Sequence, residues 1–508
     1  MEGSAGRAAS RAGRGWAALA GIASAVLTLG VGQLAAALTS PSAAPLVVVG
    51  DAVVDLVPPW LKDLAIAWFG TADKAVLLAT VGALVAVLAA VAGLLARRRP
   101  AAGVAVVAAL GAVGVLAALT RPDAGPLTPL PSALGAVAGA LALVGLVPRV
   151  GRPAPAGRRA LLVGGFAAGG LVAAGAGRLV SGRRSAEASR AAVVLPSPAS
   201  PAAPLPPGVD PLGGDLTPYV TPNADFYRID TALVVPDVPA ETWRLRVHGM
   251  VEEELEIGFD ELLALPLTER WITMTCVSNE VGGDLAGNAR WLGYPLADLL
   301  ARVRPREGAD MLLATSVDGF TLGAPLADVV DGRDALLAVG MNGEPLPREH
   351  GFPVRMVVSG LYGYVSACKW VVDLEVTRFA DRTAYWTERG WAERGPVKTA
   401  SRIDVPRSFA RLEAGPVTVA GVAWAQDRGI ERVEVRVDDE PWREARIVPS
   451  VSDDTWCQWV FDWDAAEAGS HRLAVRATDG TGEVQTQERA APVPDGASGW
   501  HTVTVSVG

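Results

Sequence analysis

Five long apolar runs in the first 195 residues constrain this chain more than any other feature. A helix needs roughly 20 apolar residues to cross the hydrocarbon core of a bilayer. The runs lie at about 16–38, 75–96, 101–120, 131–147 and 160–180, and the fourth is the shortest. Because a backbone inside a bilayer has to satisfy its own hydrogen bonds, the sequence predicts an all-α transmembrane bundle of about five spans in residues 1–195.

Basic residues in the loops between the runs indicate on which side of a membrane each loop lies. Arginines precede the first run, follow the second and separate the fourth from the fifth. They are Arg7, Arg11, Arg14, Arg97, Arg98, Arg99, Arg149, Arg152, Arg158 and Arg159. Cytoplasmic loops hold an excess of Lys and Arg, so the N-terminus is predicted to be cytoplasmic and the residues after 195 extracytoplasmic. Four arginines would lie on the outside in this topology, against the rule: Arg178, Arg183, Arg184 and Arg190. They weigh less because they precede a long exported region.

Two shorter features of this region have interpretations of their own. Residues 46–70 contain Lys62 and Asp63 and are interrupted by Pro58-Pro59, which predicts an interfacial segment and not a sixth span. Arg158-Arg159 opens the fifth run and resembles a twin-arginine export signal. The same pair could simply anchor that helix at the cytoplasmic face, and the sequence leaves both interpretations open.

Charge and cysteine content separate the second part of the chain from the first. Lys and Arg number 17 against 7 Asp and Glu before residue 196, and 28 against 47 after it. The second part is therefore acidic, which argues against nucleic acid as a partner. The three cysteines, Cys276, Cys368 and Cys457, are too far apart for a Cys-x-x-Cys metal site, and one disulfide between Cys368 and Cys457 remains open.

The part after the apolar runs divides into three by composition and pattern. Residues 196–222 are rich in Pro, Ala and Gly without apolar periodicity, which predicts an extended, partly polyproline II linker. Residues 223–404 mix short β runs with short helices, such as 259–265 and 296–303, and predict an α+β domain. Residues 405–508 contain β runs separated by turn residues and predict an all-β immunoglobulin-like sandwich.

Cys276 ends the β-prone run Trp271-Ile-Thr-Met-Thr-Cys276, where a thiolate could ligate a soft metal. Taken alone, a single cysteine is more often an inert buried thiol. Two later stretches change the interpretation. They are Met341-Asn-Gly-Glu-Pro-Leu-Pro-Arg-Glu-His350-Gly-Phe-Pro-Val-Arg355 and Gly360-Leu-Tyr-Gly363-Tyr-Val-Ser-Ala-Cys368-Lys369-Trp370. Together the three segments resemble the sulfite-oxidase family of molybdenum-cofactor enzymes, and the resemblance covers about residue 223 to the C-terminus.

The resemblance implies a molybdopterin cofactor with Cys276 as the catalytic metal ligand and the pterin dithiolene and oxo groups as the other ligands. It also implies a set of pterin contacts. These are Asn223, Phe226, Tyr227, Thr315, His350, Arg355, Ala367, Cys368 and Lys369. Arg355 suits the pterin phosphate because a guanidinium fork bonds two oxygens. Each of these residues alone has an ordinary structural explanation, such as a turn or an ion pair. The family resemblance rests on all of them occurring in this order along the chain.

Two positions depart from the family pattern on the substrate side. Sulfite oxidases carry arginines just after the metal-ligand cysteine and in the later Lys-containing run, where these arginines bind sulfite. Here the corresponding residues are Glu280 and Ser366. Because a carboxylate repels a dianion, sulfite is predicted to be a poor substrate, and a neutral or cationic S-oxide or N-oxide fits better. Arg290 could partly replace the missing positive charge.

The sequence therefore predicts a membrane-anchored molybdopterin-dependent oxidoreductase that performs two-electron oxygen-atom transfer on a small molecule. No histidine precedes His248, so the helices cannot supply bis-histidine haem ligation, and no haem is expected. Electrons would then pass to a separate partner, either a cytochrome or a quinone-linked carrier. The resemblance also implies that the sandwich can form a homodimer. A non-catalytic surface binding module remains the alternative, and a transporter subunit is disfavoured because the helices lack polar breaks.

Overall fold

The computed structural model describes residues 2–58, 61, 64, 68–69, 73–121, 124–152, 155–183 and 185–508. Parts of two predictions fall outside these residues: Pro59, Lys62 and Asp63 of the interfacial segment, and Arg184 among the arginines that would lie on the outside. The chain divides into two compact units. The first contains Met1–Ala188 with Thr231–Asp237, and the second contains Ser189–Asp230 with Val238–Gly508.

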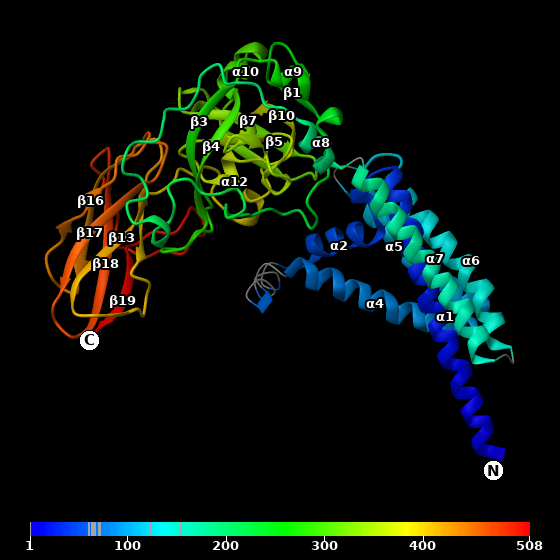
Figure 1. The fold of residues 1–508 in the computed structure, drawn as a ribbon. Coiled ribbons are helices and arrows are strands. Elements are labelled where there is room, and N and C mark those ends of the chain that lie inside the picture. Colours follow the sequence, from blue (N-terminus) through cyan, green and yellow to red (C-terminus); the bar gives the residue numbers. More distant parts are fainter. Residues whose placement is uncertain are drawn as a thin grey trace. The chain divides into compact units, whose positions relative to one another are not determined.

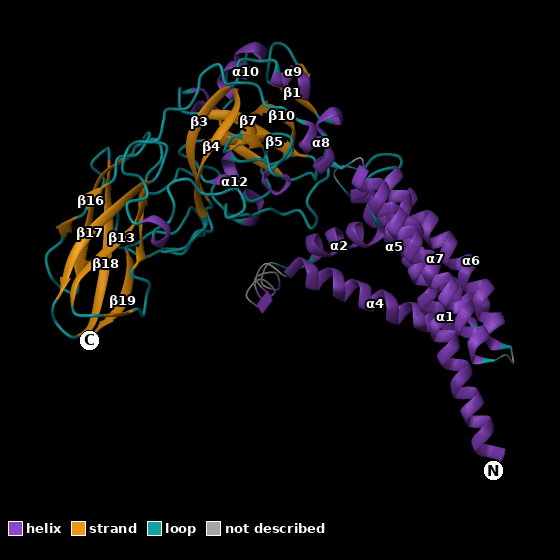
Figure 2. Cartoon of the chain, viewed as in Figure 1, coloured by secondary structure: helices purple, strands orange, loops and turns teal. Residues whose placement is uncertain are grey.

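The first unit is helical (Figures 1 and 2). Among its described residues, five helices are long and apolar. These are α1 (Glu2–Leu38), α4 (Asp73–Ala96), α5 (Pro100–Leu119), α6 (Leu130–Gly151) and α7 (Ala156–Arg183). The stretches able to cross a membrane by length and composition are Gly13–Leu38, Lys74–Ala96, Pro100–Leu119, Leu130–Gly151 and Ala156–Ala192. The predicted positions of the five apolar helices are confirmed. Shorter helices are η1 (Pro41–Ala43), α2 (Pro45–Leu56) and α8 (Ala186–Ala192).

Helix α1 packs against α4, α6 and α7. Glycines bring the backbones together at these contacts. A Cβ on Gly21 would overlap the carbonyl oxygen of Ala89 on α4, and one on Gly30 would overlap that of Gly170 on α7. Small residues at helix contacts are typical of helices that pack inside a bilayer, so this packing is compatible with membrane spans.

The second unit begins with an α+β region that contains two sheets. One sheet has the order β2-β1-β10-β5-β6, and the other has the order β3-β4-β7-β8, with β9 paired to β7. The strands are β1 (Arg244–Gly249), β2 (Leu255–Gly258), β3 (Thr268–Thr275), β4 (Ala286–Pro295), β5 (Met311–Ser316), β6 (Thr321–Pro325), β7 (Ala335–Met341), β8 (Glu344–Pro345), β9 (Arg355–Val358) and β10 (Val371–Thr377). Only β1 and β10 pair in parallel among these strands.

Short helices connect the strands of this region. They are η3 (Gly213–Asp215), η4 (Ala240–Thr242), α9 (Phe259–Leu263), α10 (Leu296–Val303), α11 (Leu326–Val330), η5 (Arg348–His350), α12 (Gly363–Ser366) and η6 (Thr387–Arg389). Helix α10 buries Leu296, Leu299, Leu300 and Val303, the spacing that places apolar residues on one helix face. The mixture of short helices and strands agrees with the predicted α+β architecture.

Residues 400–508 form a β-rich region in which all residues are described and none is helical. Its two sheets have the orders β11-β13-β17-β16 and β12-β19-β18-β14-β15. The strands are β11 (Ala400–Val405), β12 (Arg411–Leu412), β13 (Gly415–Trp424), β14 (Ile430–Val437), β15 (Arg443–Glu444), β16 (Arg446–Ile447), β17 (Cys457–Ala465), β18 (Gly469–Asp479) and β19 (His501–Val507). Both sheets contribute to one core, with Val419 and Trp459 from the first and Val475 and Val505 from the second.

Residues 196–222, the predicted linker, contact their own unit at several points. Ala199 N–H donates to Leu267 O at 2.8 Å, and Glu269 N–H donates to Ser200 O at 2.8 Å. Tyr219 is 1% exposed and its hydroxyl lies 2.8 Å from the Thr455 hydroxyl. Residues 196–222 therefore pack against their own unit, and we call them the strap. Burial of the Tyr219 ring and pairing of the backbone stabilise this packing.

The three cysteines are buried and free. The disulfide that the sequence left open between Cys368 and Cys457 is therefore not formed. Cys368 precedes β10 in the α+β region, whereas Cys457 begins β17 in the C-terminal β-rich region.

Candidate active site

Cys276 directly follows β3 and opens a tight loop that leads into β4. Its backbone N–H donates to Leu285 O at 2.9 Å, and the Asn279 N–H donates to Cys276 O at 3.0 Å. The Asn279 side chain accepts from the Leu285 N–H at 2.9 Å, so the loop is closed on itself. We call residues 276–285 the thiol loop. The pairing of β3 with β4 ends at Thr275 and Ala286, which fixes both ends of this loop.

The thiol of Cys276 is buried, with 8% of the residue exposed. Burial raises the pKa of this thiol, and hydrogen bonds with Ser278 oppose the increase. A buried thiol of raised pKa is a weak nucleophile, whereas a metal ion displaces the proton and binds the thiolate. Burial therefore makes Cys276 a weak nucleophile as a free thiol, as it does Cys368 and Cys457.

Tyr227 connects the thiol loop with a second group of residues. Burial raises the pKa of the Tyr227 phenol, the charge of Cys276 raises it further, and the charge of Arg355 lowers it. The phenol thus lies within electrostatic reach of both residues. A Cβ on Gly363 would lie 3.6 Å from Tyr227 Oη and 3.8 Å from Thr275 O, so Tyr227 extends to the end of β3.

Arg355 begins β9 and is 4% exposed. Its Nη1 donates to His350 O at 3.1 Å, and its Nη2 donates to Ala367 O at 3.4 Å. The guanidinium also lies over the Trp291 ring, 5.1 Å from the ring centroid. The predicted residues His350, Arg355 and Ala367 are therefore brought together, although His350 and Ala367 take part through their carbonyl groups.

The charge of Arg355 is buried without a carboxylate to balance it among the described residues. Burial lowers the pKa of its guanidinium to about 10, and the charges of Tyr227 and Cys368 oppose that decrease. A buried cation without a counter-charge is costly, so its presence favours a site that receives an anion. A phosphate group matches the two-pronged donor geometry of Arg.

Aromatic rings surround this guanidinium. Phe226 stacks on Tyr227 with centroids 5.2 Å apart and meets His350 and Trp291 edge to face at 5.5 and 5.8 Å. His350 Nε2 donates to Asn223 O at 3.0 Å. Burial and the neighbouring guanidinium lower the pKa of His350 to about 4. The imidazole is therefore neutral near pH 7 and contributes a hydrogen-bonding ring without a charge.

Lys369 has a protein carboxylate as partner, unlike Arg355. Its Nζ lies 2.9 Å from Asp230 Oδ2 and donates to Glu349 O at 3.2 Å. Burial lowers the pKa of Lys369 to about 8, and Asp230 opposes that decrease. Next to it, the Cys368 thiol is fully buried, and burial raises its pKa. The amine stays cationic at neutral pH because Asp230 holds it.

Thr315 is on β5, opposite Asp373 and Thr321. No hydrogen bond joins it to Cys276 or Arg355 within the described part of the chain. Ser316, the next residue, points to the other face of the strand. Its hydroxyl is buried without a hydrogen-bond partner among the described residues.

The two substrate-side candidates are separated by the structure. Glu280 is exposed on the thiol loop, four residues after Cys276. Arg290 is on β4, four residues beyond the Thr275–Ala286 pair, which is roughly 13 Å along a strand. Its Nε lies 3.2 Å from Glu269 Oε1, so its charge is already balanced.

Sequence patterns did not reveal the contacts of Asp230 and Trp291 with the predicted residues Lys369 and Arg355. Asp230 pairs with a lysine 139 positions away, and Trp291 reaches Arg355 only through the sheet register.

Comparisons with known proteins agree with this geometry. Residues 232–386 match a family model described as "Oxidoreductase molybdopterin binding domain". Mitochondrial sulfite oxidase of Mus musculus is 30% identical over 343 residues, which cover 57% of this chain and 62% of that protein. The uncharacterized oxidoreductase YuiH of Bacillus subtilis is 31% identical over 185 residues, 36% of this chain and 90% of YuiH. The sulfane dehydrogenase SoxCD structure from Paracoccus pantotrophus has a TM-score of 0.51 at 26% identity, covering 57% of this chain and 82% of that chain.

These matches and the residues around Cys276 and Arg355 define a molybdopterin-binding oxidoreductase domain. The chain belongs to the sulfite-oxidase family of molybdopterin-dependent oxidoreductases. It spans 62% of the length of the mouse sulfite oxidase and 49% of the length of the human enzyme.

The residues present fit molybdopterin, because Arg355 offers a buried cation without a carboxylate partner in the described chain to an anionic group.

Proposed function

We propose that this chain is a membrane-anchored molybdopterin-dependent oxidoreductase that transfers an oxygen atom and two electrons to or from a small molecule. One observation carries the proposal: a buried thiol and a buried arginine without a carboxylate partner in the described chain both lie within electrostatic reach of Tyr227. We assign the anchor to residues 1–195, the strap to 196–222, the cofactor-binding domain to 223–404 and the β-rich domain to 405–508.

The proposed roles of the residues follow from their surroundings. Cys276 supplies the sulfur ligand, and the bound metal centre supplies the two-electron chemistry. Arg355 binds the pterin phosphate, while Phe226, Tyr227 and His350 form the walls beside it. Ser316 is a better candidate than Thr315 for the hydroxyl contact, because its hydroxyl is buried and without a partner in the described chain. Lys369 adds a positive charge that Asp230 orients.

The five apolar helices and the arginines between them support a membrane location with a cytoplasmic N-terminus and an extracytoplasmic catalytic region. Molybdopterin is inserted in the cytoplasm, so this region would cross the membrane already folded. Arg158 and Arg159 lie in the first turn of α7 and are the proposed export signal. Electrons would be exchanged with a separate cytochrome or quinone-linked carrier.

The C-terminal domain is proposed to be an immunoglobulin-like sandwich. Two largely antiparallel sheets around one shared core support this assignment. The resemblance to the family favours a homodimer formed through this domain.

The proposed substrate is a neutral or cationic S-oxide or N-oxide and not sulfite. Glu280 adds negative charge to the thiol loop, and Ser366 is buried with its hydroxyl donating to Leu361 O and Tyr362 O. Neither provides the cation that the family pattern places there. Arg290 does not compensate, because Glu269 balances its charge.

Metal analysis of the full chain in detergent, produced in a host that makes molybdopterin, tests the enzyme assignment. We expect about one molybdenum and one pterin per chain, and loss of the metal's thiolate absorption band in Cys276→Ser. The purified chain is then assayed with a viologen donor against S-oxides, N-oxides and nitrate, and with an acceptor dye against sulfite.

Turnover of sulfite alone would overturn the substrate proposal while leaving the enzyme class intact. A folded chain without molybdenum or pterin would overturn the enzyme class. The remaining function would then be a non-catalytic surface module that retains the cofactor fold.

A further inference from the structure

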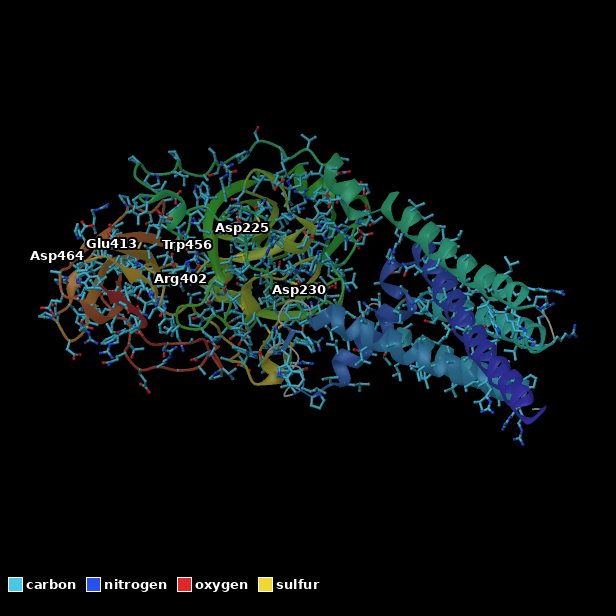
Figure 3. All side chains as sticks on the ribbon, turned by 60° about the horizontal axis from the view of Figure 1, so that its bottom comes forward. Asp225, Asp230, Arg402, Glu413, Trp456 and Asp464 are labelled. Atoms are coloured by element: carbon cyan, nitrogen blue, oxygen red, sulfur yellow. The ribbon has the colours of Figure 1, made fainter. Side chains whose placement is uncertain are left out.

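The C-terminal β-rich region contacts the thiol loop directly through Arg402 of β11. Figure 3 labels Arg402 and Trp456 where this region adjoins the α+β region. Arg402 Nη1 donates to Gly283 O at 2.7 Å and Nη2 to Thr217 Oγ1 at 2.8 Å. Nε donates to Asp404 Oδ1 at 2.6 Å. The guanidinium thus has all three nitrogens engaged, and the residue is 8% exposed.

A second contact comes from His501, the first residue of β19. Gly282 of the thiol loop has φ +84° and faces the His501 ring so closely that a Cβ there would overlap the ring. The ring is held in turn by the Ile403 N–H, which donates to His501 Nδ1 at 3.0 Å. Arg402 and Ile403 are neighbours on β11, so one strand fixes both contacts with the loop.

The strand that leads to Cys276 is held by the same region. Gln426 is fully buried, and its Nε2 donates to Thr273 O at 2.9 Å and to Thr275 Oγ1 at 3.1 Å. Trp456 N–H donates to Thr273 Oγ1 at 2.8 Å. Val277, directly after the thiol, packs in a cluster with Trp456. Residues more than 100 positions away therefore fix the backbone both before and after Cys276.

We propose that Arg402 and His501 are positioning residues for Cys276. They hold the thiol loop in one conformation, so that the sulfur occupies one place relative to the pterin-binding residues. The metal-ligand role of Cys276 rests on the proposed function, whereas the hold on the loop is a property of the chain itself. A loop closed only by its own hydrogen bonds opens locally at low cost, and contacts from a second region suppress that opening.

The test measures the alkylation rate of each cysteine by iodoacetamide, followed by peptide mass spectrometry. It uses the full chain in detergent, produced in a host without molybdopterin, so that no metal protects the thiol. Arg402→Met removes the donors, and Arg402→Lys keeps the charge with one donor group. Arg476→Met is the matched control, because Arg476 pairs with Glu434 in the same region without contacting the loop.

We expect Arg402→Met to raise the Cys276 rate by about tenfold or more, because losing a charged hydrogen bond increases local opening by that factor. Arg402→Lys falls between wild type and Arg402→Met. The rates of Cys368 and Cys457 stay unchanged, and Arg476→Met resembles wild type at all three. An unchanged Cys276 rate in Arg402→Met overturns the proposal, as does an equal rise at all three cysteines, which would assign Arg402 to general stability.

His501→Ala is a second, independent variant that removes the ring facing Gly282 while leaving Arg402 in place. A faster Cys276 rate in this variant supports the proposal, and an unchanged rate contradicts the role of His501. In the cofactor-loaded chain, the same variants should shift or weaken the metal–thiolate absorption band. If wild type holds no molybdenum, only the proposed function fails, because the alkylation rates are measured without it.

Discussion

The ammonium nitrogen of Lys369 lies 2.9 Å from a carboxylate oxygen of Asp230, and the two side chains are only 10% and 4% exposed. Such a pair is costly to assemble but more costly to break, since removing one partner leaves the other charge buried alone. Asp230 also lies 2.9 Å from Arg228 Nε, so one carboxylate serves two cations. Arg355 instead donates to three backbone carbonyls, and its charge has no carboxylate partner among the described residues.

Replacing Asp230 with Asn should destabilise the chain by about 3 kcal/mol at pH 6, because a buried ammonium loses its counter-charge. The pKa of Lys369, already lowered to about 8, would fall further. As pH rises and the amine becomes neutral, the destabilisation should shrink. Thermal unfolding in detergent at pH 6 and pH 8.5 measures this difference. Asp381→Asn, which breaks an exposed pair with Arg378, should change the Tm little at either pH.

Replacing Arg355 with Lys should weaken pterin retention by about 10- to 100-fold, because a lysine keeps the charge but not the two-pronged donor geometry. Pterin fluorescence and molybdenum content after repeated dilution measure the retention. Arg476→Lys serves as the control and should retain both. Equal retention by Arg355→Lys and wild type would remove Arg355 from the phosphate site.

Replacing Asp454 with Asn should stabilise the chain at alkaline pH. Burial raises the pKa of Asp454 to about 6, the charges of Asp334 and Asp427 add to the increase, and a hydrogen bond from Ser359 opposes it. The folded chain therefore binds a proton between pH 3.8 and 6 that the unfolded chain has lost, so stability falls as pH rises through this window.

The gain from Asp454→Asn should reach at most about 3 kcal/mol at pH 8 and disappear near pH 4. Midpoints of unfolding at pH 4, 6 and 8 check both ends of this range. A gain that is the same at all three pH values would mean that the carboxylate is not the cause.

Alkaline phosphatase fusions test the proposed topology, because this reporter is active only after export. Fusions after Gly125 and Leu195 should be active, and fusions after Arg98 and Arg152 inactive. The double variant Arg158→Lys, Arg159→Lys should abolish export of the catalytic region if the pair is a twin-arginine signal. Normal export of that variant would leave the pair as a simple anchor of α7.

The sequence predicted those helices and strands whose apolar residues follow a regular or continuous pattern within one segment. The run 296–303 coincides with α10 (Leu296–Val303), and the apolar runs coincide with the five long helices. The position of Cys276 directly after a strand is also as predicted. In each case, a periodic or continuous apolar pattern is visible without knowledge of any distant residue.

The sequence did not predict contacts between distant segments. The partner of Lys369 lies 139 positions earlier, and Arg402 reaches a carbonyl 119 positions earlier. Neither pairing has a local pattern, because the choice of partner depends on sheet register and on how the two regions pack. The composition of residues 196–222 predicts an extended linker, but extended Pro-rich composition does not say which surface the segment covers.

The strap has a practical consequence for work on the soluble part. Strand β3 is an edge strand of its sheet, and Ser200 pairs with Thr268 along that edge. Trp271 Nε1 donates to Ala203 O at 2.9 Å on the same segment. A truncated protein beginning at residue 223 would expose this edge and invite strand-to-strand aggregation, whereas one beginning at residue 189 would keep the edge capped.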